Sequence, residues 1–309
     1  MANSSDPARR RWSDLTVLGL MRAGTAPLTQ SFAVSLAALG HNAQAAFVRL
    51  FDNGYHPNAS GEHTRRLEGI SVRNLSVRYG DRYALESLTG EFGPASLTAV
   101  VGPNGAGKSS LLKALAGILR PAIGQVTCAA AEWHRLAYLP QRDELDRGFP
   151  ITVAELVALG DWRDFGALRK PPRRLAASVY EAIAAVGLSS LADQQISELS
   201  VGQFQRALFA RLLLQDADVI LLDEPFASLD ENTTQDLLPI LQRWRTEGRT
   251  VVAVLHDLDQ VRRYFPSTLL LARSPIAWGE TSVSLSVDNL ARAKQALNPP
   301  ESAHIGLVA

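Results

Sequence analysis

The chain carries short, almost wholly apolar runs separated by stretches with helical spacing. Runs of three to six residues are too short for helices, and they predict buried β-strands. The run Asp218–Asp223 has an apolar interior and ends in acids, which is typical of a parallel strand covered on both faces. The predicted strands are Leu97–Val101, Leu136–Leu139, Asp218–Asp223, Val251–Leu255 and Leu269–Leu271.

Apolar residues spaced three and four apart predict helices between these strands. Two helices begin at capping boxes, where Thr152 precedes Glu155 and Ser200 precedes Gln203. In each box the two side chains can satisfy backbone N–H groups at the helix N-terminus. Apolar stripes mark two further helices, one with Leu111, Leu112, Leu115 and Ile118 and the other with Val179, Ile183 and Val186.

Proline and glycine punctuate the pattern. The turn pairs Gly80-Asp81 and Gly93-Pro94 flank short apolar–polar runs, which predicts β-hairpins ahead of the strand Leu97–Val101. Pro239 lies inside the predicted helix Thr233–Arg245, where it predicts a kink or a later helix start.

The two ends of the chain are weakly patterned. Residues 1–68 have no strand pattern, and we interpret them as a weakly ordered N-terminal extension. Within it, Ser31–Leu50 has the spacing of one amphipathic helix. The chain from about Asn289 is expected to be loosely held.

Composition narrows the setting of the protein. Lysine and arginine together number 31, as do aspartate and glutamate, so no bulk charge draws the chain to nucleic acid or an anionic membrane. Cys128 is the single cysteine, which excludes an intramolecular disulfide and suits a reducing compartment. No run reaches the ~18 apolar residues of a membrane span. Val17–Met21 is too short for the core of a signal peptide. A cytosolic protein is expected.

A glycine-rich loop joins the strand Leu97–Val101 to the helix that follows it. The loop has the pattern G-x-x-x-x-G-K-[ST], with Gly102, Gly107, Lys108 and Ser109 at the fixed positions. Glycines allow the backbone to curl so that its N–H groups converge, and the helix N-terminus adds positive character. We therefore predict a polyphosphate site, with Lys108 reaching the β- and γ-phosphates of a nucleotide and Ser109 binding Mg²⁺.

Two adjacent acids and a histidine follow buried strands. Asp223 and Glu224 lie at the carboxyl end of a predicted parallel strand, where open α/β sheets bind ligands. One carboxylate can complete a Mg²⁺ shell and the other can polarise an attacking water. His256 ends a strand that we expect beside the nucleotide strands. Tyr79 ends an earlier strand, and its pattern alone leaves open whether it packs on neighbours or stacks on a base.

Together these residues resemble the ATP-binding subunit of an ABC transporter, over roughly Leu67–Glu280. The resemblance implies an α/β fold: a P-loop NTPase core with a mostly parallel sheet and flanking helices, an antiparallel β subdomain and an inserted helical subdomain. It divides the chain into 1–68 as an extension, 69–280 as the ATPase cassette with its helical part at about 142–205, and 281–309 as a tail. The motifs stand in family order: Tyr79 as the adenine-stacking aromatic, Gly102–Ser109 as Walker A, Gln141 as the Q-loop, Leu199–Gln203 as the signature, Val219–Glu224 as Walker B, Ser228–Asp230 as the D-loop and His256 as the switch histidine.

The resemblance implies ATP hydrolysis coupled to transmembrane transport, with ATP and Mg²⁺ as cofactors. It makes Glu224 the general base, places His256 at the γ-phosphate end and makes Gln141 an organiser of the attacking water. Ser109, Gln141 and Asp223 are the implied Mg²⁺ residues. The implied nucleotide-binding residues are Tyr79, Gly102, Pro103, Asn104, Gly105, Ala106, Gly107, Lys108, Ser109, Ser110, Ser200, Gly202, Gln203 and Asp230.

The implied partners follow from the same resemblance. Two copies would form a homodimer that holds two ATP molecules between Walker A of one chain and the signature of the other. The dimer would sit on the inner face of the cell membrane through permease subunits, with an extracytoplasmic solute-binding protein beyond them and no nucleic acid. The segments Tyr138–Gly160 and Leu212–Asp230 look like the subgroup that imports manganese, zinc or iron. An importer of chelated iron or haem is the nearest rival.

The signature reads LSVGQ, with Val201 where a glycine is common. Valine would be strained if that position needed a positive φ. The capping box of Ser200 and Gln203 instead predicts Val201 in the first helical turn with ordinary angles. Two other classes stay open: a soluble ABC ATPase of DNA repair or translation, and a regulator that binds nucleotide without turnover. A single P-loop without a heptad run disfavours the first, and Glu224 with His256 disfavours the second.

Overall fold

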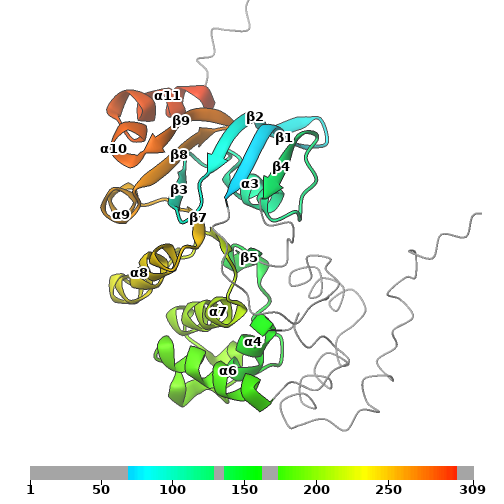
Figure 1. The fold of residues 1–309 in the computed structure, drawn as a ribbon, viewed down its shortest axis with the longest axis vertical. Coiled ribbons are helices and arrows are strands. Elements are labelled where there is room, and N and C mark those ends of the chain that lie inside the picture. The colour runs from blue at the N-terminus through cyan, green and yellow to red at the C-terminus, as the bar shows by residue number, and fades with distance from the viewer. Residues whose placement is uncertain (1–68, 129–135, 162–172, 298–309) are drawn as a thin grey trace, which may run out of the picture.

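The computed structural model describes residues 69–128, 136–161 and 173–297 (Figure 1). The N-terminal extension 1–68 and its predicted helix at Ser31–Leu50 lie outside the described residues.

The centre of the fold is a sheet of six strands in the order β5-β6-β7-β3-β8-β9. The first five strands run parallel, and β9 pairs antiparallel to β8. All five predicted strands are confirmed, with bounds that shift by a few residues. We did not predict β9, because its side chains are mostly half-buried and form no apolar run. The strands are β3 (Leu97–Val101), β5 (Leu136–Leu139), β6 (Val219–Asp223), β7 (Thr250–Val254), β8 (Ser267–Ala272) and β9 (Ser274–Glu280).

A second, antiparallel sheet has the order β2-β1-β4 and comprises β1 (Ile70–Tyr79), β2 (Arg82–Phe92) and β4 (Ile123–Cys128). The turn Gly80-Asp81 joins β1 to β2, so the first predicted hairpin is confirmed. The second hairpin, at Gly93-Pro94, was wrong because β2 and β3 belong to different sheets. We also missed β4, whose side chains are exposed or half-buried and give no apolar signal.

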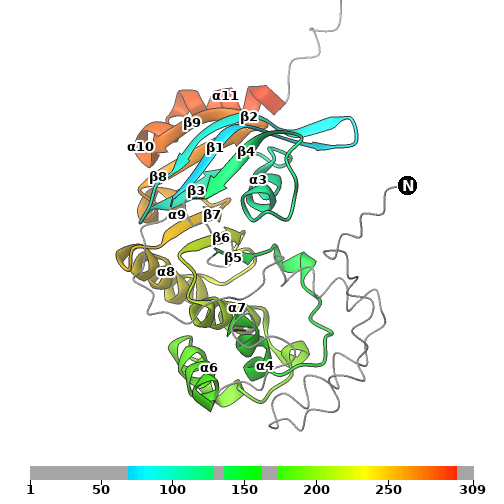
Figure 2. The ribbon, with the colours of Figure 1, turned by 45° about the vertical axis from the view of Figure 1, so that its right-hand side comes forward.

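The two faces of the parallel sheet are covered by different elements. One face carries α3 (Lys108–Leu115) and the antiparallel sheet, and together they enclose one apolar core. The other face packs against the helices of a second core (Figures 1 and 2). Alternate residues of the same strand enter the two cores, which confirms the expected burial of both faces. On this face α7 (Val201–Gln215) and α8 (Glu231–Thr246) contact the sheet, and α4 (Val153–Ala158) and α6 (Arg173–Ala185) pack against α7 on the side away from the strands. Short 3₁₀ turns lie at Arg142–Glu144, Leu159–Asp161, Ser189–Leu191 and Ile196–Glu198.

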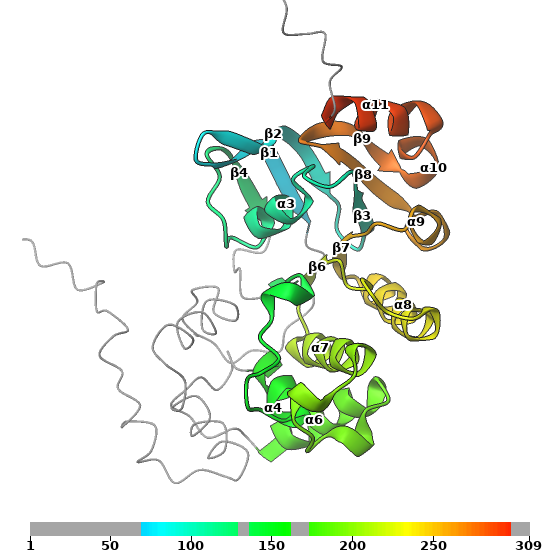
Figure 3. The same cartoon turned by 180° about the vertical axis from the view of Figure 1, so that it is seen from behind.

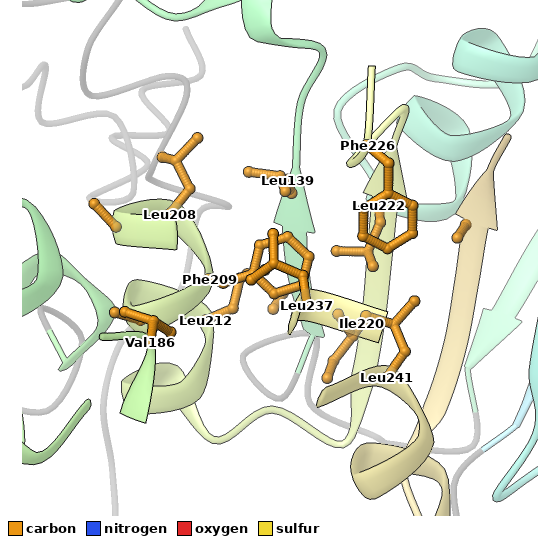
Figure 4. Close-up of a cluster of buried hydrophobic side chains, with 14 of the residues drawn as sticks. Leu139, Val186, Leu208, Phe209, Leu212, Ile220, Leu222, Phe226, Leu237 and Leu241 are labelled. Carbon is orange, nitrogen blue, oxygen red and sulfur yellow. The ribbon is translucent and has the colours of Figure 1, made fainter. Parts of the chain in front are cut away.

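An aromatic stack joins α7 and α8 to the parallel sheet, and Figure 4 shows Phe209 and Phe226 of this stack within the surrounding core. The ring of Phe209 on α7 lies 5.9 Å from Trp244 on α8, nearly parallel to it, and 6.2 Å from Phe226, which follows β6. Leu222 of β6 packs in the same cluster. The stack fixes α7 against the strand that ends in Asp223.

Two helix predictions need correction. The stripe on α3 ends at Leu115, since Gly117 has φ 72° and closes the helix, so Ile118 lies beyond it and is 44% exposed. The helix that contains Pro239 starts earlier than predicted, at Glu231, because Asp230 caps it. Its interior tolerates the proline as one continuous helix.

The C-terminal part is ordered further than expected. Helix α9 (Leu258–Tyr264) lies between β7 and β8, and α10 (Thr281–Ser284) and α11 (Val287–Leu297) follow β9 (Figure 3). Buried Leu285 and Ala293 join the core beside β8. The expectation of a loosely held chain from Asn289 was therefore wrong up to residue 297, because a short apolar stripe sufficed to dock α11.

Candidate active site

The glycine-rich loop lies between β3 and α3 and is confined by backbone on two sides. Gly102 and Gly107 have φ of 155° and 91°, conformations that disfavour other residues. A Cβ added at Gly102 would lie 2.0 Å from the Leu271 carbonyl oxygen, and one at Gly107 would lie 2.2 Å from that of Ala84. Both glycines are thus required by close approach of the backbone.

Lys108 begins α3 and is almost fully buried. Its Nζ donates to the carbonyl oxygens of Gly102 at 2.8 Å and Pro103 at 3.0 Å. Burial lowers the pKa of Lys108, although the charges of Glu224 and Asp223 oppose that shift. A cavity of about 270 Å³ opens beside it, lined by Asn104, Gly105, Ala106, Gly107, Lys108, Ser109, Ser110, Gln141 and Glu224.

Asp223 lies at the end of β6 and carries a buried carboxylate. Ser109 donates from Oγ to its Oδ1 at 3.1 Å, whereas Oδ2 makes no hydrogen bond to the described residues. Burial raises the pKa of Asp223 to about 6, and the negative charge of Glu224 adds to the shift while the Ser109 hydrogen bond opposes it. A carboxylate held in this way gains from a nearby cation.

Glu224 follows directly, with its backbone in the left-handed region at φ 52°. This uncommon conformation turns its side chain towards the cavity wall. Its Oε1 lies 2.6 Å from His256 Nε2. Burial acts to raise the pKa of Glu224, but hydrogen bonds from His256 and Gln141 outweigh it and leave the pKa lowered. Glu224 is therefore a carboxylate at neutral pH.

Tyr138 is a neighbour of this site that sequence reasoning did not single out. It pairs with Leu221 in the register of β5 and β6, which places it beside Asp223. The side chain is 6% exposed, and burial followed by the charge of Asp223 raises its pKa. An aromatic with a hydroxyl in an otherwise apolar strand was the available signal.

The signature residues lie outside the cavity, at the N-terminus of α7. The capping box is confirmed: Ser200 N donates to Gln203 Oε1 at 2.8 Å and Gln203 N to Ser200 Oγ at 3.2 Å. Val201 is the first helical residue and does not have a positive φ. Ser200 is exposed, and Val201, Gly202 and Gln203 are half-buried.

Thr233 connects the signature to the D-loop within one chain, which sequence reasoning also missed. A Cβ added at Gly202 would lie 3.2 Å from Thr233 Oγ1. That hydroxyl donates to Asp230 Oδ2 at 2.8 Å, and Thr233 N donates to Oδ1 at the same distance. Asp230 thus caps α8 beside the signature glycine.

The structure accordingly gathers the predicted site residues into two groups. The P-loop, Asp223, Glu224, Gln141 and His256 surround the cavity or contact its lining. The signature residues and Asp230 form a separate polar surface. Tyr79 ends β1 with 52% of its surface exposed, and it does not line the cavity.

Comparison with known proteins matches residues 85–227 to the family model described as ABC transporter. The chain is 39% identical over 228 residues to the manganese transport system ATP-binding protein MntA of Synechocystis, covering 72% of this chain and 88% of that protein. It is also 39% identical to the zinc transport system ATP-binding protein TroB of Treponema pallidum, covering 72% and 86%. The manganese transport protein MntB of Listeria monocytogenes is 36% identical, covering 72% and 94%.

Solved structures show the same fold. An inward-facing metal-chelate type ABC transporter superposes with a TM-score of 0.65 at 29% identity, covering 74% of this chain and 88% of that one. An ATP-binding cassette in its ADP conformation superposes with a TM-score of 0.63 at 21% identity, covering 74% and 99%. None of the helices in the described part of the chain is both long and apolar enough to traverse a bilayer.

Proposed function

This chain belongs to the ABC transporter family, and on that premise we propose that it is the ATP-hydrolysing subunit that powers import of a manganese, zinc or iron ion. The observation that carries the catalytic part is the P-loop cavity with Glu224 on its wall and His256 2.6 Å from that carboxylate. A phosphate cradle with an ionised carboxylate beside it is suited to hydrolysis of the terminal phosphoryl bond.

The cavity residues have distinct roles in this proposal. Lys108, now bound to loop carbonyls, turns to the β- and γ-phosphates when ATP enters, and loop N–H groups bind the phosphate oxygens. Glu224 takes a proton from the water that attacks the γ-phosphorus, as the bond to the β-phosphate oxygen breaks and ADP leaves. His256 moves from Glu224 to the γ-phosphate, which frees the base. Tyr79 stacks on the adenine.

The residues around Asp223 fit Mg²⁺. Oδ2 of this buried carboxylate makes no hydrogen bond to the described residues, and Ser109 supplies a hydroxyl beside it. These hard oxygen donors, with Gln141 at the cavity wall, suit Mg²⁺ bound through few protein ligands. The ion, when bound, neutralises charge on the phosphates.

The separate signature surface indicates how two copies would act. Ser200, Gly202 and Gln203 do not line the cavity of their own chain, so we propose that they close over ATP bound by a second copy. Closure and hydrolysis would alternate in a homodimer. Permease subunits would receive this motion and hold the dimer at the inner face of the membrane, with a solute-binding protein outside.

The named relatives support the metal substrate. Three proteins named for manganese or zinc transport are 36–39% identical to this chain over most of their own length. The metal-chelate transporter is 29% identical, which keeps a chelated-iron or haem importer as the second candidate.

A deletion in the host distinguishes these substrates. Loss of the gene should lower the cellular content of one metal, measured by mass spectrometry in medium with free manganese, zinc and iron. Wild-type chain should restore it and Glu224→Gln should not. A strain with normal free-metal contents that loses growth only on haem or chelated iron would favour the second candidate. Normal contents and growth in every medium would refute both.

A further inference from the structure

We infer that Arg147 is a positioning residue that fixes the signature helix relative to the segment after Gln141. This inference rests on the proposed two-copy ATPase, because the signature acts only when a second copy closes over it.

Arg147 contacts the first residue of the signature and the residue that directly follows it. Its Nη2 donates to the carbonyl oxygen of Leu199, the residue before the N-cap Ser200. Its guanidinium also lies over the ring of Phe204, 5.1 Å from the centroid. Phe204 is 2% exposed and Leu199 is 4% exposed, so both contacts are anchored in the core. One side chain therefore brackets the residues from Ser200 to Gln203.

The segment that carries Arg147 is also tied to the P-loop helix. Glu144 Oε1 lies 2.6 Å from Nζ of Lys113 on α3. The turn at Arg147 is held by a hydrogen bond between its two neighbours, in which Gly148 N donates to Asp146 Oδ1 at 2.9 Å. Because Gln141 lines the ATP cavity and lies just before this segment, a short stretch of chain spans from the cavity to the signature.

Simple stabilisation of α7 does not account for the placement of Arg147. The positive end of the helix dipole lies at this N-terminus, where a cation is unfavourable. A planar guanidinium nevertheless fits here, because it can stack on an aromatic face while it donates in its own plane. Lysine cannot do both. Arg147 therefore serves to orient the signature residues at the N-terminus of α7.

The test measures ATP-driven dimerisation of the full chain in the Glu224→Gln background. Sedimentation over a range of ATP concentrations gives the half-maximal value. Adding Arg147→Ala should raise that value roughly tenfold, as expected for loss of a charged hydrogen bond that orients the signature. Arg147→Lys should give an intermediate shift. Binding of a fluorescent ATP analogue to dilute monomer should stay unchanged in both.

Arg206→Ala is the matched control. Arg206 also lies on α7 and donates to a backbone carbonyl, that of Val186 at 3.3 Å, while it pairs with Asp236. It does not touch the segment after Gln141, so its removal should change the half-maximal ATP concentration less than twofold. An equal shift in Arg206→Ala would overturn the inference, because any loosening of α7 would then suffice.

Two further outcomes separate this inference from the function on which it rests. If Glu224→Gln alone dimerises with ATP but both Arg147 variants close at the same concentration, the role of Arg147 is refuted and the two-copy ATPase stands. If Glu224→Gln does not dimerise at any ATP concentration, the two-copy ATPase fails and this inference fails with it. Should Arg147→Ala not fold, an unshifted Arg147→Lys overturns the role.

Discussion

The P-loop cavity and the signature surface differ in how far one chain completes them. The cavity holds a buried lysine, a buried carboxylate with an oxygen that makes no hydrogen bond to the described residues, and a glutamate in the left-handed region. At the signature, Ser200 and Gln203 satisfy each other's backbone, and Asp230 is paired with Thr233. Groups that are unfavourable in the free protein are thus concentrated where ATP would bind. The polar groups of the signature are already paired with one another, and in this sense the signature is relaxed.

This difference separates pre-organisation from assembly. Polar groups that are costly in the free protein gain most when a ligand pairs them, which suits a site that binds a charged nucleotide. A relaxed polar surface gains only when another molecule comes to it. Variants at the cavity should therefore change chemistry or nucleotide affinity, and variants at the signature should change closure.

The largest effect is expected from Glu224→Gln. The amide keeps the shape of the side chain but cannot accept the proton of the attacking water, so turnover should fall by about 10²–10⁴-fold. Nucleotide affinity should stay near the parent value. Phosphate release under saturating ATP measures the change. Turnover at the parent rate would show that another group is the base.

Lys108→Ala should act one step earlier, on nucleotide binding. Loss of a cation that pairs with the phosphates should weaken ATP affinity by roughly 10–100-fold in calorimetry. Arg243→Ala is a control on exposed surface, since that side chain is 68% exposed. An unchanged ATP affinity in Lys108→Ala would remove the assignment of the cavity.

The P-loop cavity and the signature surface also show which features could be predicted from the sequence. The glycine-rich loop, both capping boxes and the acids at the end of β6 were predicted because local chemistry dictates them: a backbone curl, paired N–H groups and an apolar strand end. The contacts of Thr233 with Gly202 and of Arg147 with Leu199 could not be, since they join segments far apart in sequence.

The missed elements have one physical cause. Strands β4 and β9 are held by backbone pairing at sheet edges, where side chains are half-buried or exposed and periodicity is weak. Helix α11 is short and offers only a narrow apolar stripe, so docking on β8 and β9 decides its order. The hydrophobic pattern identifies strands that are buried on both faces. It fails for segments whose conformation is selected by tertiary contacts alone.

The buried carboxylate of Asp223 predicts that the stability of the protein depends on pH. Asp223 has its pKa raised to about 6 in the folded chain, above the value of 3.8 for an unperturbed carboxyl. Protonation of Asp223 therefore contributes to the free energy of unfolding fully below pH ~4, and this contribution is lost as pH rises past ~6. In EDTA without nucleotide, Asp223→Asn should gain about 2 kcal/mol in free energy of unfolding relative to the parent between pH 4 and 7.5. Denaturant unfolding at each pH measures it, and a difference independent of pH would contradict the raised pKa.

The smallest effect is expected at Val201. Substitution there tests whether the signature surface is free of backbone strain. Val201 occupies the first helical position without a positive φ, so glycine there relieves no strain. Val201→Gly should leave turnover unchanged within about twofold. It should lower stability by about 0.5–1 kcal/mol, because glycine is the poorer helix former, which shifts melting by about 1–4 °C. Val201→Ala is the matched control: it removes the same methyl groups from the closing surface but favours the helix, so its melting should not fall. Faster turnover in both variants with unchanged melting would show instead that the valine methyls obstruct closure, and that the second copy needs backbone approach at this position.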